Sequence, residues 1–310
     1  MTDPAELASP VAGRVPRRGR SLRAGRSTFS FPLTGPEVVA HRGATAEAPE
    51  HTLAAYRRAA DIGADAVECD VRMTRDGVLV CVHDRQIATT SNGRGVVSGL
   101  HLDELEQFHF GARRSALRSR WADDEITAVT DEPDVESGLV LTLERLLDYI
   151  TATPGTVRLA IETKHPTRHA RKVEEALVAC LERFGLLRGG TPVEWAGKPA
   201  VRMMSFSQLA VRRMTDLAPG IPTVQLLGKR LRPLRRELLS GSAMAVGPGI
   251  SLIRSDPDYV AAAHAAGKQV HVWTVNRPDD MDLVRDLGVD VIITDDPDEM
   301  LRRLGRETSH

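Results

Sequence analysis

Short apolar runs rich in β-branched residues alternate with longer amphipathic stretches between residues 37 and 294. The short runs have the length and composition of buried β-strands. They cover residues 37–41, 66–71, 78–83, 158–162, 200–205, 223–227, 243–246, 269–275 and 291–294. The stretches between them place apolar residues at helical spacing. They predict helices at residues 52–62, 143–150, 169–184, 207–217, 256–266 and 278–287.

Start and stop signals bound several of these predicted helices. Thr52 is placed to cap the first helix, and Gly63 is placed to end it. Pro278 is typical of a first helical position, and Gly288 is typical of the position after a last turn. The boundaries therefore support the alternation of strand and helix that the hydrophobic pattern predicts.

This alternation predicts a parallel sheet covered by helices. Two α/β architectures remain open, the closed (β/α)8 TIM barrel and the open doubly wound sheet. No glycine-rich phosphate fingerprint follows the first strand, which weakens the dinucleotide-binding form of the open sheet. Nine strand candidates fit a barrel of eight if residues 78–83 are surplus, because Arg75, Asp76 and Gly77 before them are typical of a hairpin turn.

Two segments depart from the strand and helix rhythm. Residues 84–156 are interpreted as a small lid-like insertion subdomain, because a structureless loop of that length is uncommon in a compact domain. Residues 1–35 are poor in large apolar residues and predict a disordered basic tail, with contact to an anionic surface as the functional alternative. A barrel domain is expected over residues 36–303, followed by a short tail at 304–310. The arginines of the basic N-terminal tail are Arg14, Arg17, Arg18, Arg20, Arg23 and Arg26.

The insertion contains two runs of like charge. The basic run consists of Arg113, Arg114, Arg118 and Arg120, and the acidic run consists of Asp123, Asp124, Glu125, Asp131, Glu132, Asp134 and Glu136. The runs are expected to be solvated faces rather than partners, because exposed ion pairs stabilise by only about 0–1 kcal/mol.

Composition excludes several classes of protein. The 310 residues carry 41 Lys and Arg against 42 Asp and Glu, and this balance argues against a dedicated nucleic-acid binder. No run approaches the roughly 18 apolar residues of a membrane span. Three cysteines, Cys69, Cys81 and Cys180, form no Cys-x-x-Cys pair and no disulfide framework. The sequence therefore predicts a reducing compartment, the cytoplasm.

Charged and titratable residues interrupt the predicted strands near their carboxyl ends. They are His41, Arg42, Glu68, Asp70, His83, Glu162 and Lys164. Buried charges are costly unless they are paired or bind a metal ion. A buried ion-pair network closing the barrel is one interpretation. Because the departures recur on successive units, we favour the other, a site at the carboxyl ends of the strands, where barrels place their chemistry.

The residue types at these positions suit phosphate ester chemistry. Glu68 and Asp70 share one strand face because side chains alternate with period two, and Glu162 adds a third carboxylate. Three carboxylates form an oxygen cage for Mg²⁺ or Ca²⁺ rather than zinc. His41 and His83 can exchange protons near neutral pH. Nearby cations stabilise a phosphate that gains negative charge toward the transition state.

Longer segments of the chain resemble one enzyme family. The segment AHRGATAEAPEHTLAAYRRAADIGADAVECDVRMTRDGVLVCVHD resembles the opening of the glycerophosphodiester phosphodiesterases. IETK, MMSF, VHVWTVN and DVIITDDP are similar to later motifs of that family, in the same order. The resemblance covers about residues 37–300 outside much of the insertion. It implies a (β/α)8 barrel that hydrolyses small glycerophosphodiesters to an alcohol and glycerol 3-phosphate through a cyclic phosphate.

The resemblance also implies a role for each matching residue. His41 and His83 are implied as the general acid/base pair, and Arg42 and Lys164 as contacts to the phosphate. Trp273 is implied to line the pocket mouth. The ligands implied for a divalent cation, usually Ca²⁺ or Mg²⁺, are Glu68, Asp70 and Glu162.

Two departures and three alternatives accompany this resemblance. His51 stands where the family usually has Asn in Pro-Glu-Asn-Thr, and we interpret it as a modified structural position rather than as a third catalytic histidine. The charged insertion is expected to cover or rim the pocket. Asp295 and Asp296 are expected either to rim the site or to form a turn. A lysophospholipase D acting on the same bond is the alternative enzyme. A non-catalytic barrel binding a phosphorylated ligand would require a broken catalytic set, whereas every matching position is intact.

Overall fold

A computed structural model of the chain describes residues 35–111, 138–153, 155, 157–228 and 241–308. The predicted basic tail up to residue 34 and both charge runs of the insertion lie outside the described residues.

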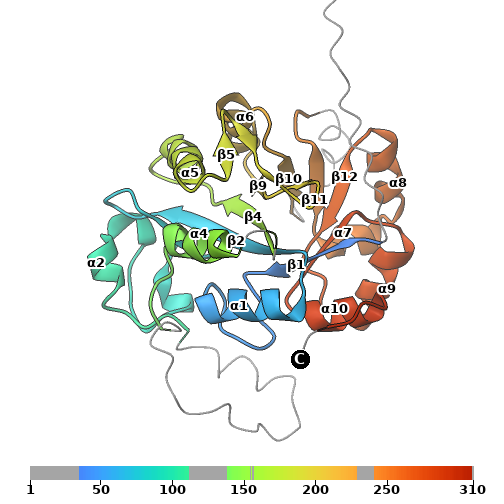
Figure 1. The fold of residues 1–310 in the computed structure, drawn as a ribbon, viewed down its shortest axis with the longest axis horizontal. Helices are drawn as coiled ribbons and strands as arrows, with labels where there is room; N and C mark the ends of the chain where they lie inside the picture. Colours follow the sequence, from blue (N-terminus) through green and yellow to red (C-terminus); the bar gives the residue numbers. More distant parts are fainter. Residues whose placement is uncertain (1–34, 112–137, 154, 156, 229–240, 309–310) are drawn as a thin grey trace, which may run out of the picture. The chain divides into compact units, whose positions relative to one another are not determined.

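Eight parallel strands close into a barrel, which confirms the TIM-barrel prediction over the open sheet (Figure 1). Strand β13 pairs back onto β1, with Val38 opposite Ile292, and β1 pairs onward to β2. The strands in order around the barrel are β1 (Glu37–His41), β2 (Ala66–Met73), β4 (Arg158–Thr163), β9 (Val201–Ser205), β10 (Thr223–Leu227), β11 (Ala245–Pro248), β12 (Gln269–Val272) and β13 (Val291–Thr294).

Strand β3 (Leu79–Cys81) is the surplus strand that the sequence indicates. It pairs antiparallel with β2, with Val71 opposite Cys81, and lies outside the ring of eight. Gly77 takes a φ of 92° in the turn between the two strands, a backbone conformation that glycine adopts without strain. The hairpin returns the chain over the end of β2, where the Val82 N–H donates to the Asp70 carbonyl at 3.0 Å. It therefore brings the next residue, His83, back to the carboxyl end of the barrel.

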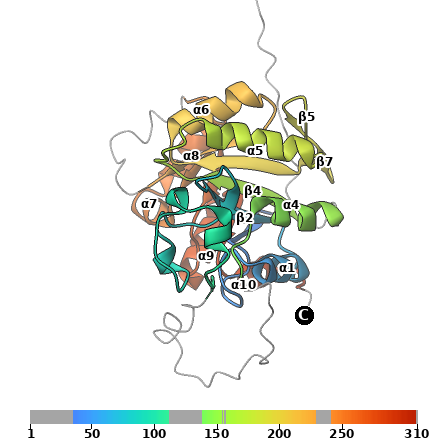
Figure 2. The ribbon, with the colours of Figure 1, turned by 90° about the vertical axis from the view of Figure 1, so that its left-hand side faces the viewer.

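Helices cover the outside of the barrel and match the predicted stretches closely. The Thr52 side chain accepts from the Ala55 N–H, and Gly63 ends the helix in the left-handed conformation, as expected. Figure 2 shows α5 and α6 on one side of the barrel and α1 and α10 on the opposite side. The helices are α1 (Leu53–Ile62), α4 (Leu143–Ala152), α5 (Lys172–Arg183), α6 (Gln208–Leu217), α7 (Ile250–Ser255), α8 (Asp258–Ala265), α9 (Pro278–Asp286) and α10 (Pro297–Arg303).

The predicted insertion range contains two kinds of structure. Helix α4 packs its apolar side into the main core, so it is one of the helices around the barrel. The described part of the segment after β3 holds α2 (Leu102–Leu105) and two 3-10 turns, η1 (Ile87–Thr89) and η2 (Val97–Gly99). Apolar residues of this segment form a small separate cluster that includes Ile87, Val97 and Leu105. Between α5 and β9, the short hairpins β5 (Leu187–Arg188) with β6 (Thr191–Pro192) and β7 (Glu194–Trp195) with β8 (Lys198–Pro199) were not predicted.

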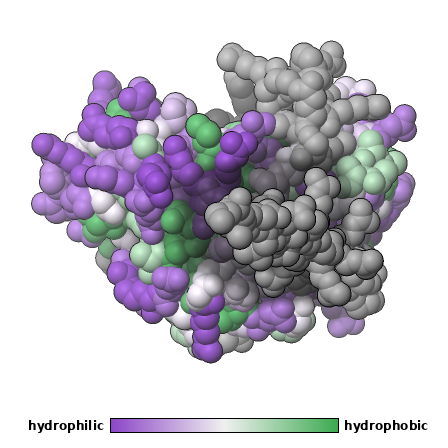
Figure 3. Space-filling model, turned by 90° about the horizontal axis from the view of Figure 1, so that it is seen from above, coloured by the Kyte–Doolittle hydropathy of each residue, from purple (hydrophilic) through white to green (hydrophobic). Residues whose placement is uncertain are grey.

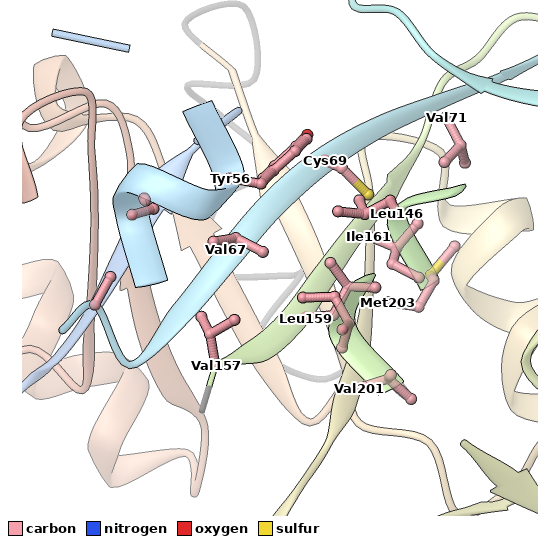
Figure 4. Packing of buried hydrophobic residues seen from close by; sticks show 14 of the residues in the cluster. Tyr56, Val67, Cys69, Val71, Leu146, Val157, Leu159, Ile161, Val201 and Met203 are labelled. Carbon is pink, nitrogen blue, oxygen red and sulfur yellow. The ribbon is translucent and has the colours of Figure 1, made fainter. Parts of the chain in front are cut away.

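The main hydrophobic core lies between the barrel and the helices. Val67, Cys69 and Val71 of β2 lie in this layer with Ile161 of β4 and Leu146 of α4 (Figure 4). Cys69 therefore points outward, opposite to Glu68 and Asp70, as strand alternation predicts. Hydrophilic residues dominate the described part of the surface in Figure 3, as expected when helices turn their apolar sides inward. No helix among the described residues combines the length and the apolar character needed to cross a membrane.

A buried ion-pair network closes the amino end of the barrel. Glu37 at the start of β1 pairs with Arg158 at the start of β4, 2.9 Å away, and with Arg202 of β9. All three lie at the strand starts, and Glu37 and Arg202 are buried. Buried ion pairs therefore join neighbouring strands at the amino end of the barrel, whereas the charges at the carboxyl ends of the strands form a separate cluster.

Candidate active site

Three carboxylates meet at the carboxyl ends of the neighbouring strands β2 and β4. Glu68 and Asp70 alternate along β2, and Asp70 lies opposite Glu162 in the β2–β4 register. One donor oxygen from each of the three lies within 4.8 Å of the others, and all three side chains are buried. The acids that the sequence places on common strand faces therefore converge at one point.

The protein's own cations only partly neutralise this cluster. The Lys164 ammonium lies 2.8 Å from an oxygen of Asp70 and 2.8 Å from one of Glu162. Burial alone would raise the pKa of Asp70, but Lys164 and His51 hold it well below its usual range. Burial and the charge of Asp70 raise the pKa of Glu162 to about 8 and hold that of Glu68 well above its usual value. Three buried carboxylate groups that the protein's own cations do not fully neutralise fit a divalent cation.

Arg42 binds the same cluster from the turn that follows β1. Its backbone N–H donates to Glu68 at 3.1 Å, its Nε lies 3.1 Å from Asp70, and its Nη1 donates to Glu50. Burial opposes the charged guanidinium, but these carboxylates raise the pKa of Arg42 above its usual value. Arg42 has a φ of 58°, a strained conformation of the kind found at functional sites. The guanidinium is therefore fixed and positively charged.

Gly43 allows this turn to pack closely. A Cβ at this position would lie 2.6 Å from the Cβ of Ala55, and the φ is 93°. Helix α1 therefore lies directly against the turn that presents Arg42.

His41 lies beside the cluster and is held by a carboxylate from the far end of the chain. It is the register partner of Glu68, so both side chains lie on the same side of the sheet. Its Nδ1 lies 2.7 Å from Asp295, which follows β13. Burial would raise the pKa of Asp295, but His41 and Asn276 lower it. A carboxylate accepts from an Nδ1–H, so Nε2 is the acceptor nitrogen of the neutral ring.

His83 also lies near the cluster, after the β2–β3 hairpin. Its Nδ1 lies 2.8 Å from Asp84, and Arg72 donates two hydrogen bonds to its backbone carbonyl, at 2.8 and 3.0 Å. Burial lowers the pKa of His83 to about 4, with Lys164 and Arg42 lowering it further and Asp70 opposing them. His83 is therefore within electrostatic reach of the cluster, and its ring is neutral at pH 7 in the ligand-free protein.

Trp273 lies on another wall of the barrel. Its indole N–H donates to the Gly247 carbonyl at 2.7 Å, and its ring meets that of Phe206 edge to face, with centroids 5.3 Å apart. These contacts place Trp273 near β11 and β12, away from the carboxylates on β2 and β4. Its place at the pocket mouth therefore stays a prediction, whereas the other predicted residues gather around the three acids.

His51 is buried in the cluster, which the sequence did not predict. Its Nε2 lies 3.0 Å from Asp70 and its Nδ1 lies 2.8 Å from the Tyr56 hydroxyl. Burial lowers the pKa of His51, although its bond to Asp70 opposes the shift. The ring therefore fixes the orientation of Asp70.

The sequence did not predict the contacts that three further residues make. Glu50 holds Arg42, Arg72 holds the His83 backbone, and Asp295 holds His41. The position after the last strand marked Asp295 as a rim or turn residue. No local pattern indicated which side chain each of the three contacts.

Comparison with known proteins identifies relatives of this chain. The model of the glycerophosphoryl diester phosphodiesterase family matches residues 41–299. The chain is 42% identical to the protein named "Probable glycerophosphodiester phosphodiesterase 1" of Mycobacterium tuberculosis, over 84% of this chain and 90% of that protein. It is 32% identical to the glycerophosphodiester phosphodiesterase of Bacillus subtilis, over 84% of each. A phosphodiesterase from Oleispira antarctica, solved in complex with the product sn-glycerol-3-phosphate, shares the fold, with a TM-score of 0.69 at 22% identity over 87% of this chain and 97% of that one.

Proposed function

The chain belongs to the glycerophosphoryl diester phosphodiesterase family and is a phosphodiesterase hydrolase, and we propose that it hydrolyses glycerophosphodiesters to glycerol 3-phosphate and an alcohol by divalent-cation-dependent histidine catalysis. The observation that carries this mechanism is the convergence of three buried carboxylates, two cations and two imidazoles at one end of the barrel. The product found in the Oleispira antarctica structure supports glycerol 3-phosphate as the product here.

Glu68, Asp70 and Glu162 would hold the cation, Ca²⁺ or Mg²⁺, because all three offer hard oxygen donors in one buried cluster. When bound, the cation supplies positive charge beside the phosphate oxygens. His51 keeps Asp70 in place by its hydrogen bond to Oδ2.

Arg42 and Lys164 bind and orient the phosphodiester. Arg42 is held by Glu50 and the carboxylates, so its guanidinium is positioned before the substrate arrives. Lys164 is held between Asp70 and Glu162. Fixed cations stabilise the negative charge that develops on phosphorus-bound oxygens without reorganising.

His41 acts as the first base and His83 as the first acid. His41 Nε2 accepts the proton of the substrate hydroxyl beside the phosphate, and Asp295 stabilises the imidazolium that results. The hydroxyl oxygen bonds to phosphorus as the bond from phosphorus to the alcohol oxygen breaks, which leaves a cyclic phosphate. His83 gives its proton to that alcohol oxygen. The anionic diester raises the pKa of His83 from about 4 so that it can carry this proton.

The second step reverses the two roles. His83, now neutral, accepts a proton from water, and the water oxygen bonds to phosphorus. The ring P–O bond breaks, and His41 returns its proton to the released hydroxyl, which gives glycerol 3-phosphate. Both histidines end in their starting protonation states.

Phosphorus NMR of a diester panel tests this function. Wild-type protein with Ca²⁺ or Mg²⁺ is expected to convert sn-glycero-3-phosphocholine to glycerol 3-phosphate with a transient cyclic phosphate. His41→Ala and His83→Ala should each lose most of kcat while folding normally. His264→Ala, on an exposed histidine of α8 outside the cluster, is the matched control. Phosphocholine as the product, or turnover of lysophospholipids alone, would contradict the proposal.

A further inference from the structure

A cavity of about 160 Å³ lies beside the proposed active site. Its walls come from the end of β2, the segment after β3, and the loop from β4 into α5. A water molecule occupies about 30 Å³ in the liquid, so the cavity can hold a group of several heavy atoms. The proposed mechanism gives this cavity no role.

Four cationic side chains line the cavity, Arg72, Arg85, Lys164 and Arg168, and none of the described lining residues is acidic. The whole chain carries a net charge of −1, so this is a local concentration of positive charge. A concave surface of one sign focuses its field on the enclosed space. The cavity therefore favours an anionic group.

Neutral acceptors hold two of these guanidinium groups. Arg168 donates to the Ser98 carbonyl at 3.0 Å, and Arg72 donates to the His83 carbonyl. Within the described part of the chain, Arg72, Arg85 and Arg168 form no ion pair with a carboxylate. Burial lowers the pKa of Arg72, although Asp70 and Asp84 oppose the shift. The charge on this wall is therefore incompletely compensated by the protein.

The cavity adjoins the side of the active site where the alcohol leaves. It shares Lys164 with the proposed phosphate contacts, and Arg72 joins it to His83, the proposed acid that protonates the leaving oxygen. We propose that this cavity is a subsite for an anionic group, a carboxylate or a phosphate, carried on the leaving alcohol. The proposal rests on the proposed function, and it adds a preference for diesters whose alcohol is itself anionic.

Glycerophosphoserine and glycerophosphoethanolamine form a matched pair of substrates, because the serine ester differs only by one added carboxylate. We expect kcat/KM for the serine ester to exceed that for the ethanolamine ester by about tenfold in the wild type, the ratio that about 1.4 kcal/mol produces. Arg85→Gln and Arg168→Gln should each lower this ratio about threefold, and the double variant should bring it close to one. Turnover of the ethanolamine ester should stay within about twofold. Arg171→Gln, on an exposed arginine paired with Glu175, is the control and should leave the ratio unchanged.

The outcomes separate this subsite from the diesterase activity itself. Equal kcat/KM for the two esters in the wild type, or a ratio that survives in the double variant, would overturn the subsite and leave the activity intact. If neither ester is turned over, the proposed function fails. Calorimetric binding of the same two esters then tests the cavity, because the subsite still predicts tighter binding of the serine ester that the double variant loses. Equal affinities would overturn it.

Inorganic phosphate distinguishes an anion on the substrate from a free anion. It should compete with the serine ester more strongly than with the ethanolamine ester, and only while both arginines are present. Phosphate that changes the turnover of both esters alike through Arg85 and Arg168 would make the cavity an effector site and overturn the proposal.

Discussion

Asp295→Asn should lower kcat because it moves the ring proton of His41 from Nδ1 to Nε2, and not because it removes a catalytic group. In the native site, Asp295 Oδ1 accepts from His41 Nδ1 and Oδ2 accepts from the Asn276 amide. An asparagine side chain has one acceptor oxygen and one NH₂ donor, so it cannot accept at both positions. One of the two neighbours must therefore lose its hydrogen bond.

We expect His41 to be the neighbour that loses its hydrogen bond to residue 295. Asn276 could flip its amide to face an NH₂ group, but its Oδ1 already accepts from the Asp295 N–H at 2.9 Å and contacts Thr294 Oγ1 at 3.3 Å. If Asn276 stays, the new NH₂ faces His41 Nδ1, and the ring proton moves to Nε2. The wrong tautomer costs about 10⁴ in kcat in a buried serine-protease triad. Because the Asp295 side chain is 37% exposed, water can partly compensate, and we expect a loss of about 10².

The assay is kcat for sn-glycero-3-phosphocholine at saturating cation, with thermal unfolding to verify the fold. Asp296→Asn is the matched control, since Asp296 caps α10 by accepting from the Glu299 N–H at 3.0 Å, and asparagine caps a helix about as well as aspartate. The control should keep its rate within about twofold. An Asp295→Asn enzyme with more than half the wild-type kcat would refute the reasoning.

Other predictions concern the supporting residues and the protons of the site. His51→Ala should lower the free energy of unfolding in urea by about 1–3 kcal/mol, because Asp70 and Tyr56 lose a buried partner, and an unchanged value would contradict this. Glu37→Gln should lower it by about 3–5 kcal/mol while leaving kcat intact, since it leaves Arg202 buried without its carboxylate. NMR of the ligand-free protein should find the His83 midpoint near 4. Below pH 6.5 the unfolded chain takes up this proton first, so the contribution of His83 to the free energy of unfolding should fall from pH 6.5 to 4, and a midpoint near 6.5 would contradict the burial argument. Calcium binding at pH 7 should release protons, because the pKa of Glu162 is about 8, and heats identical in buffers of different ionisation enthalpy would contradict this.

The hydrophobic pattern predicted the elements that form a distinct run along the chain. The barrel strands are short apolar runs, and six helices of 8 to 12 residues lie in the longer stretches between them, so the sequence located both. Helices α7 and α10 have six and seven residues, too short to stand out in this way. The strand predicted at 243–246 lies at Ala245–Pro248, because pairing with β10 sets its register and the apolar Met244 is exposed.

The candidate site could be predicted as far as strand geometry reaches. Alternation along β2 places Glu68 and Asp70 together, and the barrel places Glu162 on the next strand. No comparable rule predicts the contacts that long side chains make. His41 and Asp295 are 254 positions apart, and the reach of Arg72 to the His83 carbonyl depends on where the β2–β3 hairpin ends.

The cation dependence of turnover tests the central claim most directly, because it depends on the three carboxylates binding one ion beside the diester. We predict that a chelator abolishes hydrolysis of sn-glycero-3-phosphocholine, that Ca²⁺ or Mg²⁺ restores it in the wild type, and that Glu68→Gln needs a much higher cation concentration for the same rate. Full turnover in excess chelator, or a Glu68→Gln enzyme with the cation requirement of the wild type, would contradict the account.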